Sequence, residues 1–335
     1  MNTEAYIKAV SYFLPSNVLD NDHINASHPE WSADKISAKT GIFRRHIASE
    51  NESASDMAIN AARLLFEDFN IFPDEIDFIL YCTQSPDFIL PTTACIIQNK
   101  LSIPTTSGAL DFNLGCSGYV YGLSLAKGLV CTGLAKNVLL ITSDTYSKYI
   151  NRNDKSNKTI FGDAASATII SDVGEFKLLN FSFGTDGLGA ENLIIKNGIG
   201  KFRNRIGEDQ YDDNNNFVKN DSNLYMNGAE IFSFTSKSVP LLVADVLTKN
   251  EIEIDDIDFF VFHQANKFML DFIRKKIGIS SEKFLYHIEN VGNTVSSTIP
   301  IVIKEKMQLF KCNNRILLAG FGVGYSWAGC VIEKI

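Results

Sequence analysis

Two distant stretches of the chain have nearly the same sequence, and this repetition constrains the fold more than any other feature. Residues 74–82 read DEIDFILYC and residues 255–263 read DDIDFFVFH, an offset of 255 − 74 = 181 positions. Each is an apolar run that follows acidic residues, which is typical of a buried strand. A segment with helical spacing of apolar residues precedes each one, at residues 55–69 and 239–247. The chain is therefore predicted to contain one helix–strand unit twice.

Two shorter matches follow in the same order. Residues 113–116 (NLGC) are matched by residues 290–293 (NVGN), an offset of 290 − 113 = 177, and residues 138–141 (VLLI) by residues 316–319 (ILLA), an offset of 316 − 138 = 178. One such match would be chance, but three in one order at nearly one offset indicate an internal duplication. Helices that alternate with buried strands predict an α/β fold with mixed, mainly parallel sheets covered by helices.

The length of 335 residues fits two duplicated halves, which we place at residues 1–175 and 176–335. Within the second half, residues 196–227 are polar and rich in Asn, Asp and Gly. We interpret this stretch as a surface flap, and a disordered insert without function is an equally good interpretation.

Composition excludes several classes of function. The chain has 31 basic and 39 acidic residues and a net charge of −8, which argues against a broad nucleic-acid-binding surface. Its longest apolar runs, such as residues 316–322, are far shorter than the roughly 20 residues of a membrane helix. We see no signal peptide, so a cytoplasmic location with reduced thiols is expected. No Cys or His cluster has the spacing of zinc ligands, so we expect no metal.

Cys116 is the first candidate for chemistry. Gly115 and Gly118 allow a tight turn around its thiol, and residues 119–130 after it favour a helix. A cysteine at a strand-to-helix turn meets the positive end of the helix dipole, which favours the nucleophilic thiolate. An inert buried cysteine is the alternative.

The repeat places two further residues in equivalent positions. Asn293 lies in the loop that corresponds to the Cys116 loop, and His263 ends the repeated strand. Because sites in α/β sheets form at the carboxyl ends of strands, we predict that Cys116, His263 and Asn293 converge. Taken alone, His263 is equally a core histidine and Asn293 a helix cap.

Taken together, these segments resemble the β-ketoacyl-acyl-carrier-protein synthase III family, whose members have the thiolase fold. The resemblance runs essentially from end to end. It is carried by KTGIFRRH (39–46), PTTACIIQ (91–98), the Cys116 segment, FGDAASA (161–167), HQAN (263–266), GNT (292–294) and GFGVGYSW (320–327). The resemblance implies a duplicated five-layer αβαβα architecture with two sheets.

The resemblance also implies an enzyme, a decarboxylating condensing acyltransferase. Cys116 would take the acyl group of an acyl-CoA primer, and the backbone amides of Cys116 and Val323 would meet the oxyanion. His263 and Asn293 would hold the thioester oxygen of malonyl-acyl carrier protein while carbon dioxide leaves. The product is a β-ketoacyl-acyl carrier protein. No metal or redox cofactor is needed, and the double displacement implies ping-pong kinetics.

The residues expected to contact the substrate differ more from the family pattern than the catalytic residues do. Trp31 is expected to stack on the adenine of coenzyme A, and Lys155 stands where a basic residue meets the CoA phosphates. Asn266 and Lys267 are further candidates for CoA binding, since Phe268 occupies the position of a usual arginine. Val323 replaces a common glycine, so its loop has a different shape.

Partners follow from the same resemblance. The family forms homodimers, so residues 108–113 are the expected interface strand and Leu90 is expected to reach the partner's acyl pocket. Arg274, Lys275 and Lys276 form a basic patch that would dock the acidic carrier protein, although a solvated helix face is the ordinary interpretation of such a run.

Two alternatives remain open. One is an acyltransferase or condensing enzyme of a dedicated secondary-metabolite or glycan-linked pathway on the same fold. The other is a non-catalytic subunit that supports a partner, which the presence of Cys116 disfavours. The sequence does not determine the primer, nor whether the second substrate is carried by acyl carrier protein or by CoA.

Overall fold

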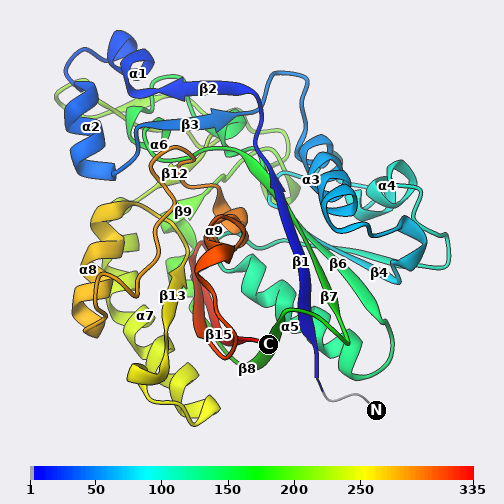
Figure 1. Ribbon diagram of the computed structural model, residues 1–335. Coiled ribbons are helices and arrows are strands. Elements are labelled where there is room, and N and C mark those ends of the chain that lie inside the picture. Colours follow the sequence, from blue (N-terminus) through cyan, green and yellow to red (C-terminus); the bar gives the residue numbers. More distant parts are fainter. Residues whose placement is uncertain (1–3) are drawn as a thin grey trace.

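The computed structural model describes residues 4–335 (Figure 1). The first half of the chain forms a five-stranded mixed sheet. Its strands lie in the order β5 (Gly108–Phe112), β4 (Phe78–Cys82), β6 (Asn137–Asp144), β7 (Ala164–Ser171) and β1 (Tyr6–Phe13).

The second half repeats this order. Its strands are β13 (Phe259–Phe262), β14 (Arg315–Gly322), β15 (Ser326–Lys334) and β8 (Phe176–Thr185). An isolated parallel bridge between Phe260 and Phe284 takes the place of the β4–β5 pairing. The repeated strands of the sequence are β4 and β13, and the later matches fall on β6 and β14, so the predicted duplication is present in the topology. The boundary at residue 175 stays a prediction.

The two half-sheets meet at one corner. Tyr6 pairs with Lys177 and Ile7 with Phe176, so β1 and β8 join the halves into one nine-stranded sheet instead of two separate ones. The sheet is mixed, as predicted, but it is not mainly parallel. Only β4–β5, β4–β6 and β13–β14 are parallel among the pairings of the nine strands within residues 4–335. One reason is that β14 and β15 are joined by residues 323–325, too short for a crossover.

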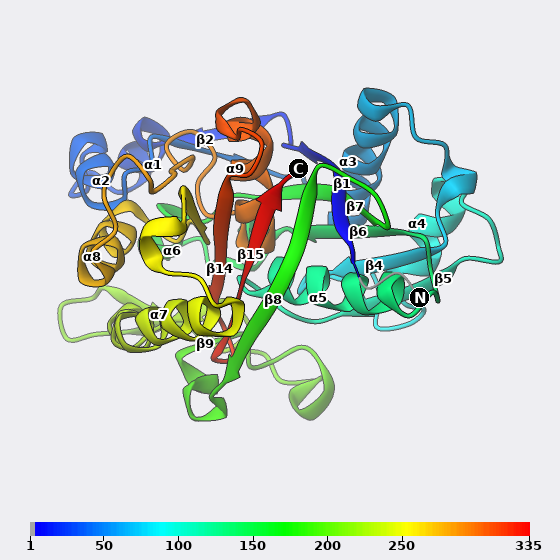
Figure 2. The same cartoon turned by 60° about the horizontal axis from the view of Figure 1, so that its bottom comes forward.

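Helices complete the five layers. One outer layer is α3 (Ala54–Phe69) with α4 (Thr93–Lys100), and the opposite one is α7 (Gly228–Asn250) with α8 (Lys267–Ile277). Between the half-sheets lie α5 (Gly118–Cys131), which contacts strands of both, and α9 (Thr298–Lys306). Figures 1 and 2 show the two outer layers on opposite sides of the molecule. The predicted α/β class and thiolase-like layering are confirmed.

Local sequence signals explain where these helices begin and end. In α3, Ser53 and Asp56 form a reciprocal capping box, and Asn70 ends the helix in the left-handed conformation. Within residues 4–335, α7 is the one helix long and apolar enough to cross a membrane by length and composition. It packs on β8, β14 and β15, as an outer helix that covers a sheet does (Figure 2).

The remaining elements form the rim of the molecule. They are β2 (Asn17–Asp20), α1 (Asn21–Ser27), α2 (Ala33–Thr40), β3 (Arg44–Ile47), α6 (Lys155–Lys158), β9 (Leu193–Ile194), β10 (Gln210–Tyr211), β11 (Phe217–Lys219) and β12 (Tyr225–Met226). The flap at residues 196–227 is a surface excursion, and it carries an ordered hairpin, β10–β11, and a strand, β12, that pairs with β9.

Candidate active site

Cys116 lies between β5 and the N-terminus of α5 and is buried. The end of β14 packs directly on it. A Cβ added to Gly320 would be 2.7 Å from the Cys116 carbonyl oxygen, and one added to Gly322 would be 2.9 Å from the Cys116 sulfur. The glycines of the 320–327 segment therefore let two distant strands close around the thiol.

His263 follows the last residue of β13 and is also buried. Its backbone N–H donates to the Ala319 carbonyl at 2.8 Å, which holds it beside β14. Its Nδ1 lies 2.8 Å from the hydroxyl of Thr298, so Nε2 is the ring nitrogen available to a ligand. Burial lowers the pKa of His263 to about 3, so the imidazole is neutral at physiological pH.

Hydrogen bonds of its backbone hold Asn293 in place. Its N–H donates to Ile160 at 2.9 Å, and its carbonyl accepts from Gly162 at 3.0 Å. Its side-chain Oδ1 accepts from the Val295 N–H at 3.0 Å, which leaves the Nδ2 amide as the group that can donate to a ligand. The preceding Gly292 has φ +75° and no room for a Cβ, since that atom would lie 2.9 Å from the Ile160 carbonyl oxygen.

The structure brings these three residues together. Cys116, His263 and Asn293 line one cavity of about 120 Å³, although they are up to 177 positions apart in the sequence. Asn266 lines the same cavity and also caps α8, because its Oδ1 accepts from the Met269 N–H at 2.9 Å. A neutral imidazole, a neutral amide and a thiol in one buried cavity suit acyl transfer.

The thiol itself is not a resting thiolate. Burial raises the pKa of Cys116 to about 12, and the nearby Asp144 acts in the same direction. Hydrogen bonds from the backbone amides of Cys116 and Val323 oppose this but do not overcome it. The expectation that the helix dipole favours the thiolate stays a prediction, and desolvation of the buried sulfur acts against it. The same two amides are those assigned to the oxyanion.

Two of the proposed CoA-binding residues, Trp31 and Lys155, form a separate cluster. Lys155 lies over the Trp31 ring at 5.6 Å, and Lys39, which we did not predict, lies over it at 5.2 Å. The Lys155 ammonium also pairs with Glu30 at 2.8 Å. Lys155 is thus partly neutralised, and the sequence around Trp31 did not reveal this.

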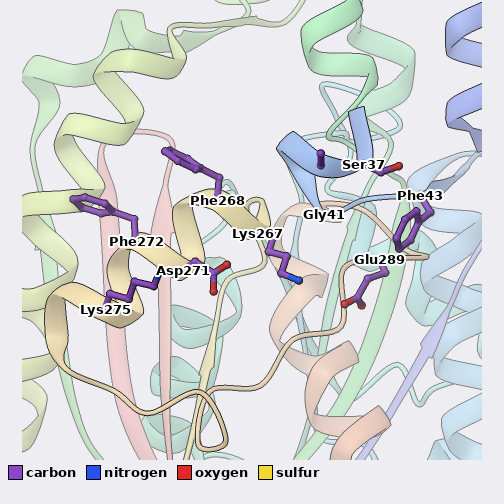
Figure 3. Close-up of a pocket in the computed structure, with 10 residues that line it drawn as sticks. Ser37, Gly41, Phe43, Lys267, Phe268, Asp271, Phe272, Lys275 and Glu289 are labelled. Carbon is purple, nitrogen blue, oxygen red and sulfur yellow. The ribbon is translucent and has the colours of Figure 1, made fainter. Parts of the chain in front are cut away.

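Lys267 and Phe268 lie at a second surface cavity of about 600 Å³ between α8 and the α2–β3 segment (Figure 3). A Cβ on Gly41 would lie 2.4 Å from the Cβ of Lys267, so these two segments touch. Figure 3 also shows the carboxylates of Asp271 and Glu289 at this cavity, so its lining carries both signs of charge.

The predicted basic patch on α8 divides into two parts. Lys275 and Lys276 are exposed, but the guanidinium of Arg274 donates to the Ile279 carbonyl at 2.9 Å and its side chain is only 15% exposed. Arg274 therefore closes the C-terminal turn of its own helix. Leu90, in contrast, is 79% exposed and does not line the cavity of its own chain.

Three functional neighbours escaped the sequence argument. Thr298 orients His263, Asp144 raises the pKa of Cys116, and Gly322 packs on the sulfur. Thr298 lies outside the motifs named above. Gly322 lies inside the motif at residues 320–327, and motif membership was its signal. Asp144 had none. Within residues 4–335, no group of three or more His, Cys, Asp or Glu side chains is arranged to hold a metal ion.

Comparison with known proteins identifies the family of the chain. Family models described as 3-oxoacyl-[acyl-carrier-protein (ACP)] synthase III and its C-terminal part match residues 110–187 and 247–334. A β-ketoacyl-[acyl-carrier-protein] synthase III of Clostridium perfringens is 34% identical over 326 residues, with 96% of both chains covered. The chain belongs to the β-ketoacyl-acyl-carrier-protein synthase III family. Its members are condensing acyltransferases, as predicted.

Other relatives agree. A synthase III of Oceanobacillus iheyensis is 32% identical, with 98% of both chains covered. A 2.1 Å crystal structure of a 3-oxoacyl-(acyl-carrier-protein) synthase III matches with a TM-score of 0.95 and 48% identity, covering 98% of this chain and 99% of that one. The synthase of Burkholderia xenovorans LB400 matches with a TM-score of 0.89 and 36% identity, covering 99% and 94%.

Proposed function

We propose that the protein joins an acyl-CoA primer to malonyl-acyl carrier protein by decarboxylating Claisen condensation, with Cys116, His263 and Asn293 as its catalytic residues. The observation that carries this proposal is the single buried cavity that the three side chains share. The names of the relatives, which are synthases of β-ketoacyl-acyl carrier protein, support the reaction class.

In the first half-reaction, the sulfur of Cys116 attacks the thioester carbon of the primer. The S–C bond to the enzyme forms, the bond to CoA breaks, and the CoA sulfur leaves with the proton that the Cys116 thiol gave up. Because burial keeps that thiol protonated at rest, its proton leaves during the attack and passes to the departing CoA sulfur. The amides of Cys116 and Val323 stabilise the oxyanion.

In the second half-reaction, malonyl-acyl carrier protein loses carbon dioxide and its α-carbon becomes an enolate. Asn293 Nδ2 and a protonated His263 Nε2 donate to the enolate oxygen. This requires the Thr298 hydroxyl to donate its one hydrogen to Nδ1 instead of to the Val295 carbonyl, which lies 3.1 Å away. The α-carbon then attacks the acyl carbon on Cys116. The enzyme thiolate is released and takes a proton from solvent, and the product is a β-ketoacyl-acyl carrier protein.

The expected homodimer belongs to the same proposal. β5 is one of the two edge strands of the nine-stranded sheet and exposes Leu110, and the exposed side chains of Phe88, Ile89 and Leu90 follow the neighbouring β4. An apolar edge of this kind favours pairing with a second copy. We further propose docking of acyl carrier protein at Lys275 and Lys276, and a cytoplasmic location.

Intact-mass analysis tests the central step. Purified protein incubated with acetyl-CoA should gain one acetyl group on Cys116, and malonyl-acyl carrier protein should then discharge it as the condensed product. Cys116→Ala should gain nothing. Normal acylation of that variant, or no adduct on the wild type across a wide primer panel, would contradict the proposal.

A further inference from the structure

A polar network lies beside the nucleophile on a side that the proposed chemistry does not use. Gln84 follows β4, and its Oε1 accepts from the hydroxyl of Tyr146 at 2.5 Å. Its Nε2 donates to Asn113 Oδ1 at 2.8 Å, and Asn113 begins the nucleophile loop. The backbone N–H of Gln84 donates to Asp144 at 2.7 Å. One side chain therefore ties the ends of β4, β5 and β6 together.

This network reaches the nucleophile loop itself. A Cβ on Gly115, the residue before Cys116, would lie 2.7 Å from Gln84 Oε1 and 2.5 Å from the Val323 side chain. Tyr146 is buried in the same apolar cluster as Cys116. Its ring centroid lies 5.2 Å from that of Phe161, which lines the catalytic cavity.

The direction from which the second substrate attacks indicates which side of Cys116 the primer occupies. The malonyl-derived carbon must approach acyl-Cys116 from the cavity that holds His263 and Asn293, and the lining of that cavity includes neither Gln84 nor Tyr146. The rest of the acyl group must then point away from the incoming carbon, and we place it on the Gly115 side of Cys116. Within its own chain, the neighbours on that side are the amide of Gln84 and the phenol of Tyr146, with Val323 as an apolar contact.

The network retains hydrogen-bonding capacity. Tyr146 donates to Gln84, so its oxygen keeps lone pairs that can accept. Gln84 Nε2 has a second hydrogen beyond the one given to Asn113, and Oε1 has a second lone pair. The Gln84–Asn113 bond is exposed, so solvent can also reach Nε2. A hydrocarbon chain would satisfy none of these groups, whereas a hydroxyl or keto oxygen on the acyl group would satisfy at least one.

We propose that Gln84 and Tyr146 form a polar primer subsite that selects short acyl-CoA thioesters whose acyl group carries a hydroxyl or keto oxygen over hydrocarbon acyl groups of equal length. This inference rests on the proposed function, since it assigns the primer of that same site. Gln84 and Tyr146 already form a hydrogen bond with each other, so an oxygenated acyl group adds only one further hydrogen bond. We therefore expect it to be favoured over a hydrocarbon acyl group by about fivefold.

Matched thioesters test the subsite. The rates at which butyryl-CoA, 3-hydroxybutyryl-CoA and acetoacetyl-CoA acylate Cys116 are followed by intact mass, each divided by the same protein's rate with acetyl-CoA. The wild type should favour an oxygenated thioester over butyryl-CoA by about fivefold. Tyr146→Phe and Gln84→Met, which remove polar atoms and keep most of the volume, should bring that ratio close to one. Tyr12→Phe removes a tyrosine hydroxyl that is bonded to Glu305 and packs in a different cluster from Cys116 and Tyr146, so it should keep the wild-type ratio.

The outcomes separate the two proposals. A wild type that takes butyryl-CoA as fast as both oxygenated thioesters, or a preference that survives in both variants, overturns the subsite while acetylation of Cys116 leaves the condensing function standing. If even acetyl-CoA yields no adduct on the wild type, the acyl-accepting role of Cys116 fails, and the subsite fails with it.

Discussion

Gly322 and Cys116 are in such close contact that a single added methyl group does not fit between them. A Cβ on Gly322 would lie 2.9 Å from both the Cβ and the sulfur of Cys116. Two glycine-flanked segments from the two halves of the duplicated chain therefore define where the nucleophile stands.

Gly322→Ala should impair acylation more than stability. The new methyl must displace the thiol or the β14–β15 turn, and a shift of about 1 Å at a reacting group costs on the order of 100-fold in rate. The acylation rate from acetyl-CoA and the midpoint of thermal unfolding are the measurements. Gly128→Ala is the matched control, because a Cβ there meets nothing within 4 Å and α5 should gain stability. Equal loss in both variants would contradict the geometry.

His263 and Asn293 should act mainly on the second half-reaction. Their hydrogen bonds strengthen as the enolate forms, and removing one such donor costs roughly 100- to 1,000-fold. His263→Ala and Asn293→Ala should therefore keep an acyl adduct on Cys116 while losing the condensed product. If Asn293→Ala lost acylation and condensation to the same degree, its assignment to decarboxylation would be wrong.

The reactivity of Cys116 should depend on pH in a manner that Asp144 controls. Since burial raises the pKa of Cys116 to about 12, alkylation by iodoacetamide should be slow at pH 7 and rise about tenfold per pH unit. Burial also raises the pKa of Asp144 to about 8, so its charge appears only above that pH. Asp144→Asn removes that charge and lowers the pKa of Cys116. The variant should react faster than the wild type above pH 8 and at the same rate below it; a faster reaction at pH 6 would refute this coupling.

Reversal of Lys275 and Lys276 to Glu should raise the apparent KM for malonyl-acyl carrier protein. Exposed charges speed the encounter with an acidic partner, and this contribution is screened over about 10 Å at 0.1 M salt, so the defect should shrink as salt is added. Reversal of the exposed Lys100 and Lys136 supplies a control of equal charge. Unchanged carrier-protein kinetics at low salt would show that α8 presents only a solvated face.

Arg274→Ala should behave differently from its two neighbours. It removes the hydrogen bond to Ile279 at the end of α8, so the free energy of unfolding should fall by about 1 kcal/mol while the salt dependence of the KM stays as in the wild type. Denaturant unfolding and the same kinetic series measure the two effects. A change in salt dependence without loss of stability would return Arg274 to the docking surface.

The duplication and the positions of the main elements were readable from the sequence, because burial of alternate faces leaves a local periodic pattern. The repeats at residues 74–82 and 255–263 became β4 and β13, and the helix predicted at residues 55–69 is α3. The register of the repeats also predicted that Cys116 and Asn293 lie near His263, since equivalent loops of duplicated sheets end at one edge. Their roles in catalysis stay predictions.

Tertiary structure decided what depends on contacts between distant segments. The pKa of Cys116 follows from how deeply the two halves bury it and from Asp144 nearby, and no pattern around residue 116 encodes either. Likewise, Glu30 reaches Lys155 across 125 positions, and Arg274 turns back to Ile279 instead of facing solvent. A local pattern determines which face of an element is buried, but the charge and freedom of a side chain depend on which other segments pack against it.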